Sequence, residues 1–276
     1  MHNMNVIAPD DFDIHGHLSN NFTEIKPKVD ALAPSFFEAV NQLNRIAQDA
    51  LYASVIKTSN ESQYVRFLLF LHLLRTYQGL IHLVYLGLQE QSIMLLRVEM
   101  ETLFKLKALK DKPELIDKYQ KDFPIQRKTY ALKLKKLIEN GTLEFTDEEI
   151  TVIEREMKEL EKVKKDGYTA DKWAESANLQ NMYMMLYPMF SQPIHSNPHQ
   201  LDKYLAVDKY GKVTNPIIIP KYDQLQKNIH LAMTLLLIAI DCIDDIIKTP
   251  KGKAPFTDRL RIIKNKLESL ADKMDV

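Results

Sequence analysis

Cysteine is nearly absent from this sequence. Cys242 is the only one among 276 residues, so the chain cannot form an intrachain disulfide. A single thiol without a disulfide framework is typical of proteins that fold in a reducing compartment. The first residues, MHNMNVIAPDDFDIHG, also lack the basic start and the apolar run of a secretory signal. We therefore expect a cytoplasmic protein.

Excess charge and glycine-rich motifs are lacking as well. Lysine plus arginine and aspartate plus glutamate both total 37, so the chain as a whole has no positive field that would attract nucleic acid or an acidic membrane. Its seven glycines build no phosphate-binding loop and no nucleophile elbow. These absences remove the main support for a kinase, a Rossmann enzyme, a hydrolase or a zinc ribbon, and we expect no cofactor.

Apolar residues at helical spacing dominate what is present. Hydrophobic residues make up 45% of the chain, which is enough for a substantial core. We predict an all-α bundle of about seven or eight helices with a short β-hairpin inserted at residues 204–219. Residues 1–33 are expected to form an irregular N-terminal arm, and residues 34–276 a single helical domain.

Two apolar stretches invite comparison with membrane spans. Residues 64–88 are interrupted by charged groups such as Arg66, which a lipid-exposed helix carries only at considerable cost. Residues 231–240 are too short to cross a bilayer before Asp241 intervenes. Both stretches predict core helices of a bundle and no membrane partner, with Gly87 inside the first of these helices.

A helix over residues 91–109 carries charges among apolar residues that face every direction, which is the pattern of a central helix. Arg97 and Glu101 lie one turn apart on one side of it. Buried charges persist when they are paired or used, so we take this pair as one half of a candidate site. The structural alternative is an ordinary ion pair at i, i+4 spacing.

The second half of the candidate site is the segment 187–199, where three prolines and two histidines interrupt the helical period. Histidine titrates near neutral pH, so His195 is a candidate general acid or base that Ser191 would orient. Arg97 would hold a phosphate through two hydrogen bonds, and Glu101 would fix the arginine or select the histidine tautomer. In the structural alternative, His195 caps or pins a helix end.

The residues of these two halves resemble a known family. The motif LLR at residues 95–97, followed by Glu101, and the Ser-x3-His motif at residues 191–195, with Tyr187 before it, resemble an uncharacterised all-helical bacterial family that is classed only as a domain of unknown function. The resemblance covers roughly residues 62–245.

A wider similarity is to the HEPN-like helical proteins, several of which are phage-defence or toxin ribonucleases. That similarity implies RNA as partner and metal-independent cleavage, in which His195 removes a proton from a ribose 2′-hydroxyl and Arg97 stabilises the charge on phosphate. Those nucleases place an arginine four to six residues before the histidine. Here Ser191 and Gln192 precede it without an arginine, so Arg97 would supply the cation from a neighbouring helix.

Residues 105–165 are predicted to include a helical hairpin with oppositely charged arms. Lys105–Lys136 contains eleven basic and four acidic residues, whereas Glu139–Glu161 contains nine acidic and two basic ones. We interpret the arms as an antiparallel pair with solvated faces. The alternative is an RNA-binding face on the basic arm, although its lysines lack a clear arginine and aromatic pattern. Pro124 marks an expected break in that arm.

A metal-dependent phosphoester hydrolase is a further alternative, with His199, Asp241 and Asp245 as ligands. Acids at the C-terminal end of the helix over residues 221–248 oppose its dipole, so something should compensate them. The ordinary candidates are Lys248, Arg259 and Arg261. We therefore assign no metal.

A non-catalytic interaction or scaffold module is the competing class. The polar centre would then only fix the helix register, and apolar surface would recruit a protein partner or a second copy of the chain. The methionines near residue 185 are interpreted as core packing. The group His72, Arg75, Gln78 and His82 would either line the same cavity as Arg97 or satisfy buried polar groups.

Overall fold

The structure is a computed structural model that describes residues 10–19, 22–142, 145–160, 162, 167–195, 201, 204–216, 219–248, 255–272 and 274. It confirms the prediction of an all-α bundle with a short β-hairpin.

The helices of the main body are α3 (Pro34–Ala53), α4 (Glu61–Tyr85), α5 (Gln89–Asp111), α8 (Ala170–Ser176), α9 (Gln180–Ser191), α11 (Leu225–Asp241) and α12 (Phe256–Ala271). The N-terminal segment contains α1 (Phe12–His15), the 3-10 helix η1 (Gly16–Leu18) and α2 (Phe22–Asp30). The remaining elements are η2 (Pro113–Leu115), α6 (Ile116–Glu139), α7 (Asp147–Leu160), η3 (Pro193–His195), β1 (Leu205–Val207), β2 (Val213–Pro216) and η5 (Asp244–Ile246).

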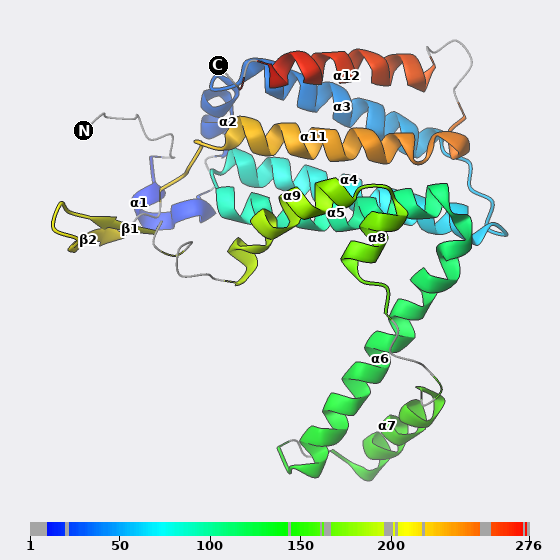
Figure 1. The fold of residues 1–276 in the computed structure, drawn as a ribbon. Coiled ribbons are helices and arrows are strands. Elements are labelled where there is room, and N and C mark those ends of the chain that lie inside the picture. The colour runs from blue at the N-terminus through cyan, green and yellow to red at the C-terminus, as the bar shows by residue number, and fades with distance from the viewer. Residues whose placement is uncertain are drawn as a thin grey trace.

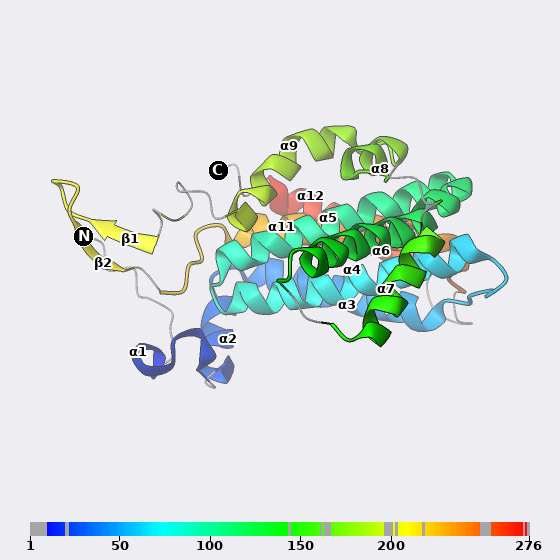
Figure 2. The same ribbon diagram turned by 90° about the horizontal axis from the view of Figure 1, so that it is seen from below.

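The body is a stack of long helices (Figure 1). In this view α12 and α3 form the upper layer, α11 lies below them, and α4 and α5 follow. Helix α5 packs against α4, α11, α8 and α9. Figure 2 shows α8 and α9 on one flank of α5 and α3 on the other side of α4. The central position predicted for this helix is therefore correct.

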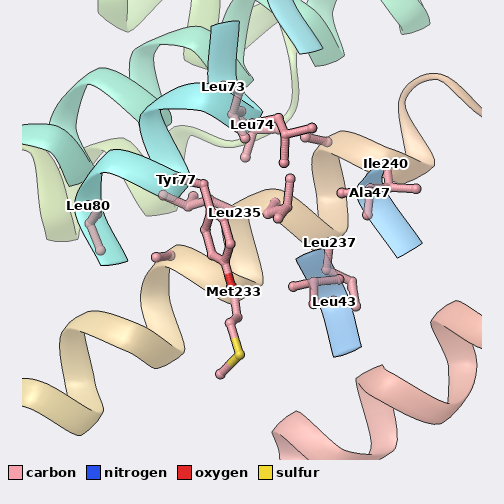
Figure 3. Packing of buried hydrophobic residues seen from close by; sticks show 14 of the residues in the cluster. Leu43, Ala47, Leu73, Leu74, Tyr77, Leu80, Met233, Leu235, Leu237 and Ile240 are labelled. Carbon is pink, nitrogen blue, oxygen red and sulfur yellow. The ribbon is translucent and has the colours of Figure 1, made fainter. Parts of the chain in front are cut away.

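The core lies where α3, α4 and α11 meet (Figure 3). Leu43 of α3, Leu73 and Tyr77 of α4, and Met233 and Leu235 of α11 are each 2% exposed or less. Truncating one such leucine to alanine costs roughly 2–5 kcal/mol. This shared core holds the elements that carry the polar residues described below.

Helix α4 passes the length and composition test for a membrane span, and it is the one described helix that does. In the bundle, 44% of its most apolar window is buried against other helices. Its Arg66 is 4% exposed and bonds to an acid of η5. These contacts identify α4 as a core helix of the bundle, as predicted.

Gly87 lies in the turn between α4 and α5, so the expectation that it sits inside a helix was wrong. Its φ is +66°, a left-handed conformation that favours glycine. A Cβ at this position would lie 2.5 Å from Cβ of Pro220, and the Gly87 carbonyl accepts a hydrogen bond from the Lys221 amide. The turn is thus fixed by a segment far along the chain.

The N-terminal segment also differs from the irregular arm that we expected. Helix α2 forms within it, and its Ile25 and Val29 are 4% and 0% exposed. The Tyr85 hydroxyl of α4 donates a 2.7 Å hydrogen bond to Asp30 at the end of α2. Apolar contacts at i and i+4 therefore attach α2 to the bundle.

The charged hairpin is formed by α6 and α7 and projects from the body (Figure 1). Pro124 lies within a continuous α6, so the predicted break was wrong. The run Thr146, Asp147, Glu148 and Glu149 predicts the N-terminus of a helix, and the structure confirms it as the start of α7. In a reciprocal cap, the Thr146 amide bonds to the Glu149 carboxylate and the Glu149 amide bonds to Thr146 Oγ1. Among the described residues, an ion pair between Arg127 and Glu156 links the two arms directly.

The apolar spacing from Trp173 to Leu186 predicts a single helix that ends at Pro188, whereas the structure has two helices here, α8 and α9. Asn178, with φ +57°, separates them, and Pro188 lies inside α9 without ending it. Ser191 is therefore the last residue of a helix and not part of a loop. The predicted hairpin is confirmed in its described part by the antiparallel pairing of β1 and β2.

Candidate functional site at the α5–α9 seam

The candidate site lies where α9 packs on α5, and it is made by Arg97, Glu101 and Tyr187. Nε of Arg97 donates a 2.8 Å hydrogen bond to Oε1 of Glu101 one turn later, as their spacing predicted. Tyr187 reaches this pair from α9. Its hydroxyl accepts a hydrogen bond from Nη2 of Arg97, and the guanidinium carbon lies 4.4 Å from the ring centroid. Two helices thus hold one arginine.

The electrostatics of this cluster keep Arg97 charged and Tyr187 neutral. Desolvation and the Glu101 carboxylate raise the pKa of the Tyr187 hydroxyl, which also hydrogen-bonds to Glu101. Burial alone would lower the pKa of Arg97, but its bonds to Glu101 and Tyr187 outweigh that effect and raise the pKa. The side chains of Arg97 and Glu101 are 19% and 35% exposed. Within the described residues, Nη1 of Arg97 has no hydrogen-bond partner.

Ser191 belongs to α9 and bonds within it. Its Oγ donates a 2.6 Å hydrogen bond to the backbone carbonyl of Tyr187, one turn earlier. Such a bond from serine to the i−4 carbonyl uses the hydroxyl proton locally. Ser191 therefore supports the turn that carries Tyr187 and has no described bond to Arg97.

His195 lies farther along the same seam. Helix α9 runs antiparallel to α5, because Tyr183 packs near Phe104 and Tyr187 packs on Arg97. Helix α9 ends at Ser191, four residues before His195, on the side toward the start of α5. The 3-10 helix η3 that ends at His195 packs against α5. The side chain of His195 lies outside the described atoms.

Tyr187 is the residue whose role the sequence analysis missed. It was part of the motif that carries the family resemblance, but no function was attached to it. The signal was its position one turn before Ser191, which places both on one face of a helix. The assumption that Pro188 ends the helix concealed this relation.

The acids after α11 are neutralised by α4 and α5. Two guanidinium nitrogens of Arg66 bond to the carboxylate of Asp245 at 2.7 and 2.8 Å, and one of them also bonds to the carbonyl of Cys242 at 2.9 Å. Lys110 bonds to both Asp244 and Asp245. The Arg66 guanidinium holds the pKa of Asp245 well below its usual range.

Two of the cations that we expected at these acids, Arg259 and Arg261, pair with other acids. Arg259 pairs with Asp49 of α3, and Arg261 pairs with Asp258 of its own helix. Among the described residues, no group of three or more histidine, cysteine or acidic side chains is placed to hold a metal ion. Asp241 is part of no such group, and His199 lies outside the described residues.

The second polar group on α4 does not converge on Arg97, so the interpretation as a shared cavity was wrong. Gln78 donates a 3.0 Å hydrogen bond to Asn44 of α3, and the His82 ring lies 5.9 Å from the ring of Phe22 of α2. These residues face α2 and α3, whereas Arg97 faces α9. His72 and Arg75 of the same group are exposed.

The interpretation of the α9 methionines as core packing is confirmed for Met182, which packs against the core, and was wrong for three others. Met184, Met185 and Met189 are 63%, 70% and 60% exposed, so they form an apolar outer face of the helix instead of core packing. Tyr183 and Leu186 are partly buried against the core, so the exposed methionines lie on the side of α9 that faces away from it.

Glu99 is a buried carboxyl on the opposite side of α5. It is 0% exposed, and neither of its oxygens has a hydrogen-bond partner among the described residues. Burial raises its pKa well above the usual range. The neighbouring Tyr77 hydroxyl has its pKa raised by burial and then by Glu99. A neutral Glu99 is consistent with this apolar environment.

Comparison with known proteins places the chain in a family and goes no further. No curated protein matches it, and no solved structure matches it. One family model matches residues 63–212, which include α5, α9, η3 and the α6–α7 hairpin. The chain therefore belongs to the family of unknown function DUF5677.

Proposed function

We propose that this protein is a cytoplasmic ribonuclease of the defence or toxin type, which cleaves RNA without a metal ion. The observation that supports the proposal is the held arginine at the α5–α9 seam. Arg97 is fixed by Glu101 and Tyr187, and its Nη1 is left without a partner in the described part of the chain. An oriented guanidinium with spare donors suits a phosphodiester oxygen.

The chemistry would be divided along the seam, because His195 belongs to η3, beyond the end of the helix that carries Tyr187. Arg97 binds a phosphate of the RNA strand, and the strand continues toward η3. There His195 takes the proton of a ribose 2′-hydroxyl as general base. The 2′ oxygen forms a bond to the adjacent phosphorus, the bond to the 5′ oxygen of the next nucleotide breaks, and that oxygen takes a proton from solvent. The products carry a 2′,3′-cyclic phosphate and a 5′-hydroxyl.

The test is RNA cleavage in EDTA by the wild type and three variants, read on a denaturing gel with analysis of the new ends. His195→Ala should lower kcat by roughly 10²- to 10⁴-fold, the usual contribution of a general base. Arg97→Ala should act mainly by raising KM, because it removes a phosphate contact. His72→Ala, which removes an exposed histidine of α4, is the matched control and should cleave normally.

The ends of the products separate this mechanism from metal-dependent hydrolysis, which would leave a 5′-phosphate and would stop in EDTA. Full activity of His195→Ala would remove His195 from the mechanism. Circular dichroism of each variant establishes that a loss of cleavage is not a loss of fold.

A second function, a non-catalytic interaction module, is favoured by the outer face of α9. Met184, Met185 and Met189 expose flexible apolar side chains that adapt well to a partner surface. If folded wild-type protein leaves total RNA and tRNA intact, this is the function that we assign. Charge substitutions such as Met185→Glu should then abolish binding to the protein partner or the second copy of the chain.

A further inference from the structure

Helix α6 carries two aromatic side chains that no other element covers. Phe123 and Tyr130 are 66% and 65% exposed. They are seven residues apart, so they lie on one face of the helix, about 10 Å apart along its axis. The hairpin projects away from the body (Figure 1), which leaves this face open to large ligands. Exposed aromatics in such a row often mark a binding surface.

Arg127 lies between the two aromatics, one turn after Phe123 and nearly one turn before Tyr130. Its guanidinium is 5.7 Å from the centroid of the Phe123 ring, and it pairs with Glu156 of α7. The side chain of Arg127 is still 42% exposed. We call Phe123, Arg127 and Tyr130 the α6 stripe. The stripe supplies the aromatic and arginine pattern that we did not find in the basic arm from the sequence.

The segment of α6 that carries the stripe is rich in positive charge, and Lys133 is the lysine nearest to the stripe around the helix, while the others lie on its remaining faces. Between residues 118 and 136 the only acid is Asp122. Asp122 is partly buried and interacts with the Tyr168 backbone and with Lys105, so it faces the body of the protein and not the stripe. The lysines of the same segment are Lys118, Lys121, Lys128, Lys133, Lys135 and Lys136. The acids of α7 lie on the other arm, and the one bonded to the stripe is Glu156.

We propose that the α6 stripe binds single-stranded RNA. Bases stack on Phe123 and Tyr130, while Arg127 and Lys133 contact phosphates, the combination by which single strands are bound without sequence preference. The choice of RNA over single-stranded DNA rests on the proposed function. The inference that bases stack on this surface rests only on the two aromatic side chains and is independent of that function. A double-stranded ligand is excluded because its bases are already stacked on one another.

Glu156 provides an internal competitor for the ligand. In the free protein its carboxylate occupies Arg127, so a phosphate must displace it. Removing the charge by Glu156→Gln should therefore strengthen RNA binding. A purely structural role of the hairpin predicts no such gain, because the same change removes an ion pair between the arms.

The test is fluorescence anisotropy with a labelled twelve-nucleotide RNA, the DNA of the same sequence and an RNA duplex, in EDTA at low salt. Binding is measured with the His195→Ala protein, so that cleavage cannot interfere. Phe123→Ala and Tyr130→Ala should each raise Kd by roughly 5- to 100-fold, which corresponds to the loss of one stacked base. Glu156→Gln should lower Kd several-fold.

The matched control is Tyr52→Ala, which removes an aromatic of α3 that is 84% exposed and far from the hairpin in sequence. It should bind as tightly as the parent protein. Replacing Lys133 by glutamine should reduce the dependence of binding on salt, because each phosphate contact contributes a slope of about −0.7 for single strands.

The proposal is overturned if the RNA does not bind, if the duplex binds as tightly as the single strand, or if both aromatic variants keep the parent affinity. Equal binding of RNA and DNA supports the stacking surface and removes only its preference for RNA. Binding at the α6 stripe without cleavage by the wild type would support this inference and contradict the proposed ribonuclease. If the wild type cleaves RNA, the stripe variants cleave as well as the wild type and RNA does not bind at the stripe, the ribonuclease proposal is supported and this inference is contradicted.

Discussion

Arg66 of α4 and Asp245 of η5 are 179 positions apart in sequence and form two parallel hydrogen bonds of 2.7 and 2.8 Å. The Arg66 side chain is 5% exposed and that of Asp245 is 38% exposed. The pair attaches the segment after α11 to the first turns of α4. A buried arginine depends on such a partner, because an uncompensated buried charge is costly.

Asp245→Asn should lower the free energy of unfolding by about 2 kcal/mol. Breaking a fully buried pair costs about 3–5 kcal/mol, and solvent screening at the partly exposed Asp245 reduces that value. The expected loss in Tm is about 4–8 °C for a chain of this size. Asp244→Asn is the control, because Asp244 contacts Lys110 and not Arg66, and it should cost less. Equal losses in the two variants would contradict a special role of Arg66.

The Arg66–Asp245 pair should make the stability of the protein depend on pH. The pKa of Asp245 is lowered in the folded protein, so its contribution to stability is fully present above the unfolded pKa of about 4. The contribution is lost as the pH falls through the folded pKa. The difference in Tm between wild type and Asp245→Asn should therefore be constant from pH 5 to 8 and shrink below pH 4. Thermal scans by circular dichroism at each pH measure it.

Glu99→Gln should become more stabilising as the pH rises. Burial raises the folded pKa of Glu99, so the folded chain keeps a proton that the unfolded chain loses above about pH 4.3. The stability of the wild type therefore falls with increasing pH through this group, whereas glutamine cannot ionise. Urea denaturation of both proteins at pH 4, 6 and 8 should show a difference near zero at pH 4 and growing in favour of glutamine. A difference that does not change with pH would mean that Glu99 is ionised and paired.

The fold was largely predictable because its signals are local. The apolar period defined α4, α5 and α11, and the Thr146 cap defined the start of α7. The Arg97–Glu101 pair also follows from spacing alone. Helix continuity through Pro124 and Pro188 was not predictable from the local cost of proline. At Pro188 the packing of α9 on α5 depends on tertiary structure that the sequence does not show.

The partners of the polar residues were not predictable, because they come from distant parts of the chain. Nothing near Asp245 indicates Arg66, and nothing near Gly87 indicates that Pro220 approaches it. Tyr187 became visible as the partner of Arg97 only when the direction of α9 on α5 was known. The two segments that the sequence analysis singled out do pack together, while the contacts between them depended on tertiary packing.

Gly87→Ala should destabilise the protein more than Gly141→Ala. Both glycines have a positive φ, +66° and +64°, so both variants strain the backbone by about 1–2 kcal/mol. At Gly141 an added Cβ meets nothing within 4 Å, whereas at Gly87 it would lie 2.5 Å from Cβ of Pro220. The extra clash requires the turn or the segment at Pro220 to move. Urea denaturation should show the larger loss for Gly87→Ala, and equal losses would indicate that Pro220 yields easily.

A double-mutant cycle on Arg97 and Tyr187 tests the held arginine itself. Arg97→Ala and Tyr187→Leu should show a coupling of about 1 kcal/mol, the range expected for a partly desolvated cation over an aromatic ring. Tyr187→Phe retains the ring and should keep part of that coupling. Met189 lies on the exposed face of α9, so a cycle of Arg97→Ala with Met189→Ala should be additive within about 0.5 kcal/mol.

The result bears directly on the proposed chemistry, because the ribonuclease proposal requires an arginine that is oriented before RNA arrives. A coupling near zero between Arg97 and Tyr187 would mean that α9 does not hold the guanidinium in solution. Arg97 would then be an ordinary i, i+4 partner of Glu101. A clear coupling with normal stability of Arg97→Lys, combined with loss of cleavage in that variant, would identify the planar guanidinium, and not its charge alone, as what the RNA requires.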